Sequence, residues 1–451
     1  IDFGGRLVVA DRERPFAASP RRAAVSAFGL GGTNAHVILE QPPVIASTRE
    51  SAVQVPRILP VSARSDVALR EACDHLASAL RDTGEALDDI AYTLQRGRRE
   101  HEYRHAVIAG SVPEALAGFE TRMRGAGALP AADHRRSVWL FSGQGSQQPG
   151  MARALYESQP VAREWIDCAA DAARPLLGLD LRDLLCGDAP GIHDTRYTQP
   201  ALFATQYAIA RTWQSFGVVP AALIGHSFGE YAAACLAGVF SFEDALLLVC
   251  ERGRLAHACP AGAMLAVRLS EAELRPMIAS EPIDIAAINA PGSCVVGGPA
   301  GAIARFSDRL AAAGYSPRLL VTERAFHSRH MAAAGDAFER VVQRVHRAAP
   351  SIPIVSTLSG QWLTAEEAVD PARWRRHLCE PVRFLDAVRT LESREPLTFL
   401  EIGPDSTLST LVLQIVEDHD RCIAASQPSL DAAIGRLWAA GIDVEWASVG
   451  P

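Results

Sequence analysis

The pentapeptide Gly-His-Ser-Phe-Gly at residues 225–229 carries the clearest chemical signal in the sequence. It follows an apolar run, 221–224, which we expect to form a strand, and it precedes a run of small residues, 230–236, which we expect to form a helix. A serine between glycines at a strand-to-helix turn is typical of a nucleophile elbow, where the helix N-terminus stabilises a developing oxyanion. An ordinary structural turn is the alternative. We predict that Ser227 is a catalytic nucleophile.

A nucleophilic serine needs a general base, and the sequence contains 13 histidines. His327 is our candidate because it follows an expected strand and precedes a helix, and such loops commonly hold catalytic groups in α/β enzymes. A half-buried histidine that caps the next helix is the alternative, and His330 is the rival base. Four other histidines lie among charged residues and are expected to be solvated: His75, His101, His105 and His346.

A second glycine loop, Gly-Gln-Gly-Ser-Gln at 143–147, follows the apolar run 138–141. It lacks the lysine of a phosphate-binding loop, so phosphate binding is disfavoured. A main-chain amide of this loop is suited to completing an oxyanion hole. A plain tight turn between a strand and a helix explains the loop equally well.

Arg252 lies in an expected helix beside the apolar run 245–249, so we expect it to be partly buried. A planar guanidinium in such a place favours a bidentate carboxylate partner. That carboxylate belongs either to a substrate or to an Asp or Glu of the protein, and the sequence leaves both possibilities open.

Composition narrows the possible functions of the 451-residue chain. All 44 basic residues are arginine, which excludes Schiff-base lysine chemistry and a Walker A loop. The net charge of −8 argues against a nucleic-acid partner, and the most apolar stretch, 231–250, is too short and too interrupted by acids to span a membrane. The nine cysteines are scattered without a Cys-x-x-Cys pair, so we expect reduced thiols, no metal site and a cytoplasmic protein. Because the chain begins at Ile1 without a signal-like segment, we expect a piece of a longer polypeptide.

The elements that must position these residues alternate between strands and helices up to about residue 415, the pattern of a largely parallel sheet. Residues 263–322 show the order strand, helix, strand, strand, helix, strand, which predicts a ferredoxin-like insert. A small α/β unit is predicted before the sheet, and an amphipathic helix is predicted in the tail after residue 430. The small unit consists of strands near 58–62 and 105–109 and helices near 67–81 and 113–124.

Four motifs together resemble those of malonyl-CoA:acyl carrier protein transacylases and, more closely, an acyltransferase domain of a type I polyketide synthase. They are Gly-Gln-Gly-Ser-Gln at 143–147, Gly-His-Ser-x-Gly-Glu at 225–230, Arg252, and Ala-Phe-His-Ser at 325–328. The segment 28–37, Phe-Gly-Leu-Gly-Gly-Thr-Asn-Ala-His-Val, resembles the C-terminal end of a ketosynthase domain. The rest of that domain, with its cysteine, is absent here, so condensing activity is not expected.

The resemblance implies an α/β fold with an α/β-hydrolase-like core, built on a parallel sheet, and a ferredoxin-like small subdomain, preceded by a small α/β linker domain. It also implies four segments along the chain. These are a ketosynthase C-terminal remnant at 1–42, a ketosynthase-to-acyltransferase linker domain at 43–136, the acyltransferase domain at 137–415 with its small subdomain at 263–322, and a post-acyltransferase linker at 416–451.

The resemblance assigns roles to the site residues. It implies that Ser227 is acylated, that His327 is its base, and that Arg252 binds the malonyl carboxylate. In this family a main-chain carbonyl orients the histidine, and Glu380 is our match for that position.

Three further residues match family positions around the same site. The main-chain N–H groups of Phe228 and Gln144 correspond to the oxyanion hole. Asn289 matches a family asparagine near the site whose role is left open.

The choice of acyl unit is also open to interpretation. In such domains an apolar residue after the serine and the string His-Ala-Phe-His accompany malonyl, whereas Gln and Tyr-Ala-Ser-His accompany methylmalonyl. This chain has Phe228 and Arg-Ala-Phe-His at 324–327. Phe326 fills the space that an α-methyl needs, and such steric exclusion discriminates by about 1–3 kcal/mol. Arg324 replaces the first histidine of the string, which leaves a hydroxy- or methoxy-substituted unit as an alternative.

The expected reaction is ping-pong transfer from malonyl-CoA to the serine, and then to the phosphopantetheine thiol of an acyl carrier protein, in polyketide or antibiotic biosynthesis. No permanently bound cofactor is expected. The expected partners are the carrier protein, the ketosynthase domain of the same polypeptide and the acyl-CoA. A serine hydrolase or thioesterase with the same elbow is the alternative enzyme, and a non-catalytic docking platform is the alternative without chemistry.

Overall fold

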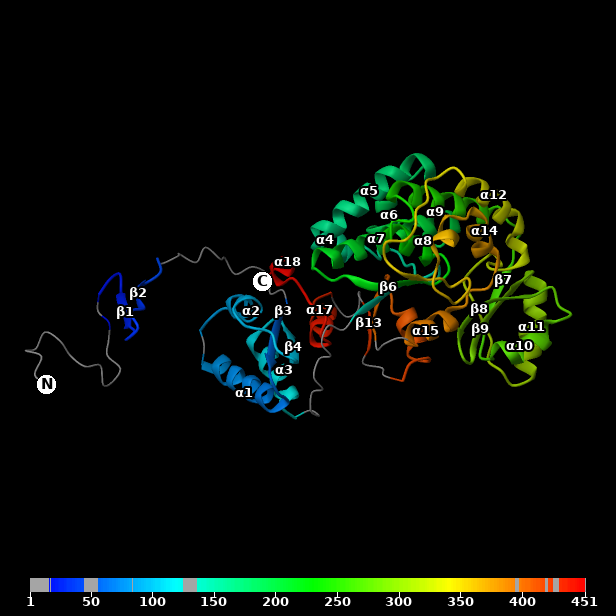
Figure 1. Cartoon of the computed structure of the whole chain (residues 1–451). Helices are drawn as coiled ribbons and strands as arrows, with labels where there is room; N and C mark the ends of the chain where they lie inside the picture. The colour runs from blue at the N-terminus through cyan, green and yellow to red at the C-terminus, as the bar shows by residue number, and fades with distance from the viewer. Residues whose placement is uncertain are drawn as a thin grey trace, which may run out of the picture. The chain divides into compact units, whose positions relative to one another are not determined.

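A computed structural model describes residues 16, 18–43, 56–82, 84–124, 136–393, 397–417, 421–424 and 430–450 (Figure 1). The chain divides into two units, 1–54 and 55–451. Within the predicted linker domain at 43–136, residues 44–55, 83 and 125–135 lie outside the described residues.

The first unit contains an antiparallel hairpin, β1 (Arg22–Phe28) and β2 (Asn34–Glu40). The glycine-rich turn between the strands includes Gly32, whose φ of 85° lies in the left-handed region that glycine tolerates. Every residue of both strands is exposed, apolar ones included. A two-stranded hairpin of this kind has no core of its own.

The predicted small α/β unit opens the second part of the chain. Its strands β3 (Arg57–Ala63) and β4 (Tyr103–Ala109) pair antiparallel, and they share a core with α1 (Asp66–Asp82) and α3 (Val112–Arg124). Sequence reasoning missed α2 (Leu87–Arg96), although its apolar residues recur at helical spacing. The predicted tail helix is α17 (Leu430–Ala439), which packs against β3 and β4.

A five-stranded parallel sheet, in the order β11-β6-β5-β12-β13, forms the centre of the large domain. The middle strands are buried along their length, as expected for a parallel sheet covered on both faces. The strands are β5 (Ser137–Phe141), β6 (Pro220–Gly225), β11 (Ile354–Val355), β12 (Thr398–Ile402) and β13 (Cys422–Ala424).

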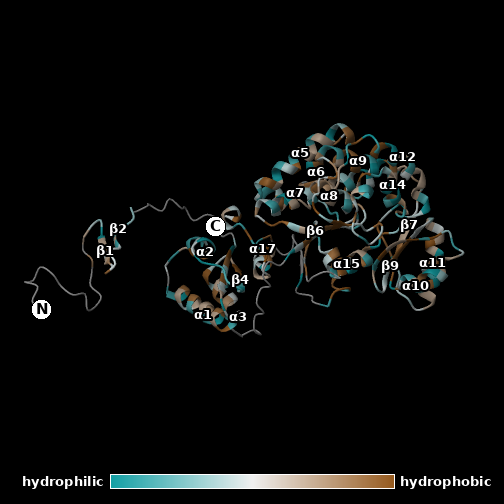
Figure 2. Ribbon diagram, in the orientation of Figure 1, coloured by the Kyte–Doolittle hydropathy of each residue, from teal (hydrophilic) through white to brown (hydrophobic). Residues whose placement is uncertain are grey.

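The helices around this sheet alternate hydrophilic and hydrophobic residues, as Figure 2 shows, which is typical of helices with one buried face. They are α4 (Arg153–Ser158), α5 (Pro160–Leu177), α6 (Leu181–Leu185), α7 (Thr195–Ser215), α8 (Gly229–Leu236), α9 (Phe242–His257), the 3₁₀ turn η1 (Arg329–Met331), α12 (Ala332–Val342), α13 (Ala365–Val369), α14 (Pro371–Cys379), α15 (Phe384–Glu392) and α16 (Thr407–Val412). A short helix, α18 (Trp446–Val449), follows α17.

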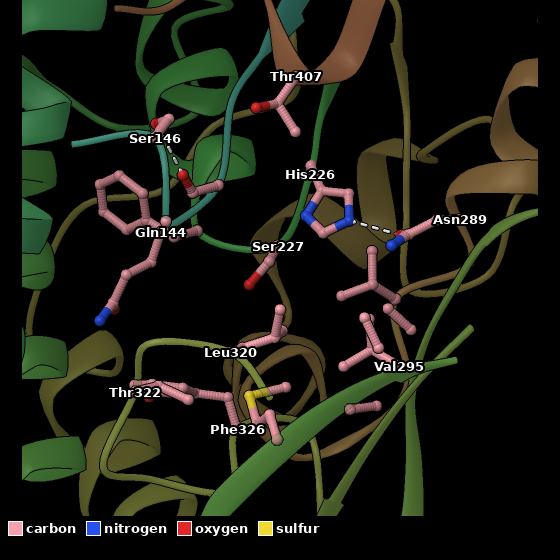
Figure 3. Close-up of a pocket in the computed structure, with 18 of the residues that line it drawn as sticks. Gln144, Ser146, His226, Ser227, Asn289, Val295, Leu320, Thr322, Phe326 and Thr407 are labelled. Carbon is pink, nitrogen blue, oxygen red and sulfur yellow. Dashed lines mark hydrogen bonds between the residues drawn. The ribbon is translucent and has the colours of Figure 1, made fainter. Parts of the chain in front are cut away.

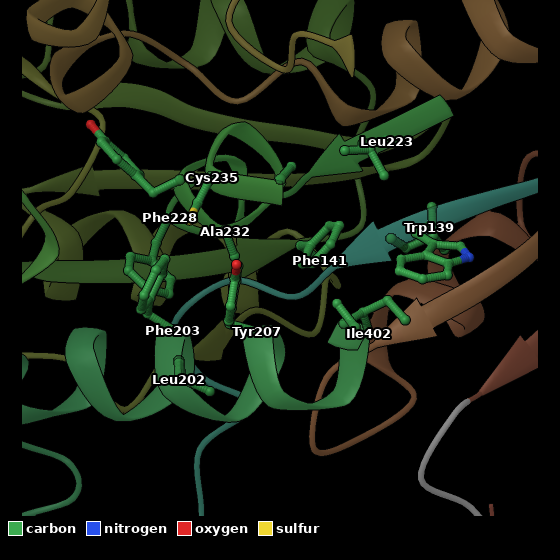
Figure 4. Packing of buried hydrophobic residues seen from close by; sticks show 14 of the residues in the cluster. Trp139, Phe141, Leu202, Phe203, Tyr207, Leu223, Phe228, Ala232, Cys235 and Ile402 are labelled. Atoms are coloured by element: carbon green, nitrogen blue, oxygen red, sulfur yellow. The ribbon is translucent and has the colours of Figure 1, made fainter. Parts of the chain in front are cut away.

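The main core lies between the sheet and the helices α7 and α8, where aromatic and aliphatic side chains pack closely (Figure 4). Trp139 and Phe141 from β5 are fully buried, as are Phe203 from α7 and Phe228 at the start of α8. This packing fixes the end of β6 and the start of α8, between which Ser227 lies.

The predicted ferredoxin-like insert has the expected order of elements. Its strands β7 (Ala263–Val267), β8 (Asp284–Ala290), β9 (Ser293–Gly298) and β10 (Arg318–Leu319) form an antiparallel sheet in the order β10-β7-β9-β8. Helices α10 (Glu271–Ile278) and α11 (Ala300–Ala312) bury one face of this sheet in a separate core. Its β7 and β9 residues also contribute to a cavity beside Ser227.

Among the described residues, no helix combines the length and the apolar character needed to cross a membrane.

Candidate active site

Ser227 occupies a sharp turn between β6 and α8. Its φ of 52° is in the left-handed region, which is unusual for a residue other than glycine and indicates a strained backbone. The flanking glycines are required sterically: a Cβ on Gly225 would lie 2.1 Å from the nitrogen of Glu230, and a Cβ on Gly229 would lie 2.2 Å from the carbonyl oxygen of Phe141. The local geometry is therefore that of the predicted elbow.

His327 lies beside this serine. Its Nε2 is 2.5 Å from Ser227 Oγ, and its Nδ1 is 2.9 Å from the main-chain carbonyl oxygen of Glu380. Because a carbonyl only accepts, Nδ1 carries the proton, and Nε2 is left to accept the serine hydroxyl's proton. His330, the rival base, does not line the cavity around Ser227.

The surroundings of His327 keep its imidazole neutral. Burial lowers the pKa of His327 well below its usual value, and the positive charge of Arg252 lowers that pKa further. A neutral imidazole is the form that accepts a proton. His327 also has a φ of 55°, so the serine and its base are both held in strained backbone conformations.

Gln144 and Phe228 carry the two main-chain N–H groups that we predict to form an oxyanion hole. Neither Gln144 N–H nor Phe228 N–H has a hydrogen-bond acceptor within the described part of the chain. The side chain of Gln144 is held in place because its Nε2 donates to Thr195 Oγ1 (3.1 Å), while its Oε1 accepts from Gln199 Nε2 (3.3 Å). Phe228 N–H lies at the N-terminus of α8, where the helix dipole favours negative charge.

Arg252 projects from α9 and is only 1% exposed. Its Nε and Nη2 have no hydrogen-bond partner, and no carboxylate pairs with it among the described residues. The guanidinium lies 5.4 Å from the ring centre of Tyr231, a cation–π contact that helps to orient it. A buried cation without an ion-pair partner is costly, so Arg252 is suited to binding an anion.

A cavity of about 680 Å³ joins these groups (Figure 3). The glycine loop 143–147, Ser227, His327 and Arg252 line it on the side of the large domain. Apolar residues of the small subdomain cover the other side: Met264, Ala266, Ala286, Ala287, Val295 and Leu320. In the described part of the chain, no aspartate or glutamate lines it.

Asn289 connects the small subdomain to the elbow. Its Oδ1 is 2.8 Å from His226 Nε2, as Figure 3 shows. His226 immediately precedes Ser227, and Asn289 lies in β8, so this contact holds the two halves of the cavity together.

The structure places the two proposed specificity residues differently. Phe326 lines the cavity. Arg324 does not: its Nε and Nη2 donate to the carbonyl oxygen of His257 (3.0 and 2.6 Å), and its Nη1 donates to that of Glu323 (2.9 Å). The guanidinium thus caps the C-terminal end of α9 instead of facing a substrate, because the last turn of that helix leaves carbonyls without partners.

Sequence reasoning missed a buried ionic cluster behind the elbow. Glu230, in the first turn of α8, pairs with Arg373 of α14 and lies 3.3 Å from His377 Nε2. Glu230 Oε2 also accepts from the main-chain N (2.9 Å) and Oγ1 (3.0 Å) of Thr357. The only signal in the sequence was the acidic residue that follows the second elbow glycine.

Comparisons with known proteins agree with this geometry. The acyl transferase domain family matches residues 138–437, and the ketoacyl-synthetase C-terminal extension family matches residues 3–108. The spectinabilin polyketide synthase system protein NorB of Streptomyces orinoci is 38% identical over 477 residues, which cover 99% of this chain and 22% of that protein. The chain therefore spans less than a quarter of that relative's length.

Solved structures of acyltransferases also resemble this chain. The acyl transferase domain of SpnD, in complex with 2-(pent-4-yn-1-yl)malonyl, is 36% identical, with a TM-score of 0.79 over 88% of this chain and 98% of the other. The malonyl CoA-acyl carrier protein transacylase of Coxiella burnetii is 26% identical, with a TM-score of 0.61 over 68% of this chain and 98% of the other. The chain belongs to the acyl transferase domain family, in the form found in type I polyketide synthases, and is an acyltransferase.

Proposed function

We propose that this chain loads a malonyl unit from malonyl-CoA, through an ester on Ser227, onto the phosphopantetheine thiol of an acyl carrier protein during polyketide synthesis. The observation that carries the proposal is the guanidinium of Arg252, which is buried in the same cavity as the Ser227–His327 pair and has no ion-pair partner in the described part of the chain. An acyl group with its own carboxylate supplies the missing partner through a charge-assisted fork.

In the first half-reaction His327 Nε2 takes the proton from Ser227 Oγ as the oxygen attacks the thioester carbonyl carbon. The N–H groups of Gln144 and Phe228 stabilise the negative oxygen of the tetrahedral intermediate. The carbon–sulfur bond then breaks, and the coenzyme A thiolate takes the proton from His327. The carbonyl of Glu380 keeps Nδ1 protonated throughout, so that it orients the base as the carboxylate does in a Ser-His-Asp triad.

The second half-reaction runs the same steps with a different thiol. His327 deprotonates the phosphopantetheine thiol, whose sulfur attacks the malonyl ester carbonyl. The bond to Ser227 Oγ breaks, and the serine recovers the proton. The malonyl carboxylate stays bound to Arg252 through both steps. Because Ser227 supplies the nucleophile and His327 the general base, the proposed transfer needs no permanently bound cofactor.

Malonyl, and not a larger unit, is the acyl group that we propose. Phe326 lines the same cavity as Ser227. We infer that its ring limits the space for an α-substituent on the acyl group. Since the guanidinium of Arg324 is engaged by main-chain carbonyls, it provides no contact for a hydroxy or methoxy substituent.

Intact-protein mass spectrometry tests this function. After brief incubation with an equimolar mixture of malonyl-, methylmalonyl- and acetyl-CoA, we expect a malonyl adduct on the wild-type chain, with methylmalonyl about tenfold less abundant. Ser227→Ala is the matched control and is expected to remain unmodified. An unmodified wild-type chain, or an adduct that persists in Ser227→Ala, would contradict the proposal. Added carrier protein should remove the malonyl group faster than water does, and the reverse order would instead indicate a hydrolase.

The rate of acylation is expected to stay constant as the pH is lowered to mildly acidic values. Because burial and Arg252 lower the pKa of His327, the free enzyme keeps its base neutral at pH 6.5, where an ordinary histidine is half protonated. We expect kcat/KM for malonyl-CoA to stay level from pH 8 to 6.5 and to fall only at lower pH. Stopped-flow or quenched-flow acylation at constant ionic strength measures this profile. A midpoint at or above pH 6.5 would contradict it.

A further inference from the structure

A second arginine lines the cavity, and the reaction described above does not use it. Arg318 lies on β10, the edge strand of the small subdomain's sheet, and its side chain is exposed. It has no ion pair or side-chain hydrogen bond among the described residues. Arg318 and Arg252 are the two arginines among the residues that line the cavity.

The register of the sheet explains why Arg318 faces the cavity. Arg318 is paired with Ala266 of β7, and paired residues of antiparallel strands project from the same face. Ala266 and Met264, two residues earlier, line the cavity, whereas Leu265 and Val267 belong to the core beneath α10 and α11. The face of this sheet that covers the cavity is therefore apolar around Met264 and Ala266. At the edge of the sheet, the same face carries the guanidinium of Arg318.

The two arginines differ in ways that suit the two ends of one substrate. Arg252 is buried beside the reacting serine, whereas Arg318 is exposed, next to Leu319 and Val321, which are 62% and 91% exposed. A malonyl-4′-phosphopantetheine unit carries a carboxylate at one end and a phosphate at the other, with an uncharged arm between them. Among the residues that the structure describes, no acidic one lines the cavity to compete for either arginine.

We propose that Arg318 binds the phosphate attached to the pantetheine arm, the group that coenzyme A and the carrier's prosthetic group have in common. This inference rests on the proposed function and adds a second anchor to it. An exposed guanidinium contributes less than a buried one, because solvent and salt screen it. Its contribution should appear as a preference for phosphorylated substrates.

Three donors of increasing length test the contact: malonyl-pantetheine, malonyl-4′-phosphopantetheine and malonyl-CoA. For the wild-type chain we expect kcat/KM to rise about tenfold from the first donor to the second. Arg318→Ala should abolish most of this rise, and Arg318→Glu should reverse it. Adding 0.5 M NaCl should also reduce the wild-type ratio.

Arg305 supplies the matched control. It is an exposed arginine on α11 of the same subdomain, does not line the cavity, and its replacement by alanine changes the net charge equally. Arg305→Ala should keep the wild-type ratio. If Arg318→Ala kept the wild-type ratio of kcat/KM between malonyl-4′-phosphopantetheine and malonyl-pantetheine, the inference would be overturned. A loss of kcat/KM confined to malonyl-CoA would also overturn it, because the contact would then be with the nucleotide. If the wild-type chain accepted no malonyl from any donor, the proposed function itself would fail.

Discussion

Replacing Arg252 with alanine is expected to lower kcat/KM for malonyl-CoA by about 30-fold to 1,000-fold, while acetyl-CoA is used as well as before or better. The guanidinium is 1% exposed and has no ion-pair partner among the described residues, so we expect a malonyl carboxylate to bind it in a site that excludes water. Removing one partner of such a buried charge pair costs about 2–4 kcal/mol, which corresponds to this range. Acylation rates with both donors, measured at equal concentrations, give the change in selectivity.

Arg254 provides the control for this experiment because it lies two residues further along the same helix. It is paired with Glu251 at 2.7 Å, and its side chain is 59% exposed. Arg254→Ala should leave the ratio of malonyl to acetyl transfer at its wild-type value. If Arg252→Ala also kept that ratio, the guanidinium would not bind the acyl carboxylate, and a generic esterase would become the better description of the site.

Arg252→Ala should not reduce the stability of the chain. Removing an unpaired buried charge relieves a desolvation cost, although the loss of the contact with the Tyr231 ring offsets part of this gain. A midpoint of urea unfolding equal to or above that of the wild-type chain would show that the kinetic loss reflects binding and not unfolding.

The elements around the site could be predicted from the sequence because local patterns determine them. The strand before Ser227, the helix after it and the βαββαβ order of the small subdomain all follow from apolar periodicity and glycine positions. The fold class and the family followed from four motifs in order. In contrast, α2 has an adequate helical pattern and was still overlooked.

Side-chain partners were harder to predict because they depend on elements far apart in the sequence. Arg324 was proposed as a substrate contact because it replaces the first histidine of the family's His-Ala-Phe-His string, yet its guanidinium binds the main-chain carbonyl at the end of α9. Glu230 and Arg373 are 143 residues apart, so no local pattern links them. The sequence alone left a carboxylate of the protein possible as the partner of Arg252. Only the structure shows that Arg252 has no such partner among the described residues.

Replacing Glu230 with glutamine is expected to lower the free energy of unfolding by about 3–5 kcal/mol, because Arg373 is then left buried without a counter-ion. The two side chains are 0% and 2% exposed, and the Nε and Nη1 atoms of Arg373 have no other partner among the described residues. Burial raises the pKa of Glu230, but Arg373 and His377 more than offset this, so the pKa lies well below its usual value. The carboxylate is therefore fully charged at pH 7. Its contribution to stability is fully present above 4.5, the pKa of a glutamate in the unfolded chain. This contribution is lost only as the pH falls through the lower pKa of the folded state.

Urea unfolding at pH 7 measures this loss of stability as a lower midpoint concentration of urea, with an unchanged slope of the unfolding free energy against urea concentration. Glu251→Ala, which breaks the exposed pair with Arg254, is the control and should cost less than about 1 kcal/mol. The double variant Glu230→Leu with Arg373→Met should recover most of the stability, because it removes both buried charges together. A Glu230→Gln variant no less stable than Glu251→Ala would contradict the pairing. A double variant that unfolds as readily as the single one would show instead that Glu230 stabilises the elbow through its hydrogen bonds to Thr357 and not through its charge.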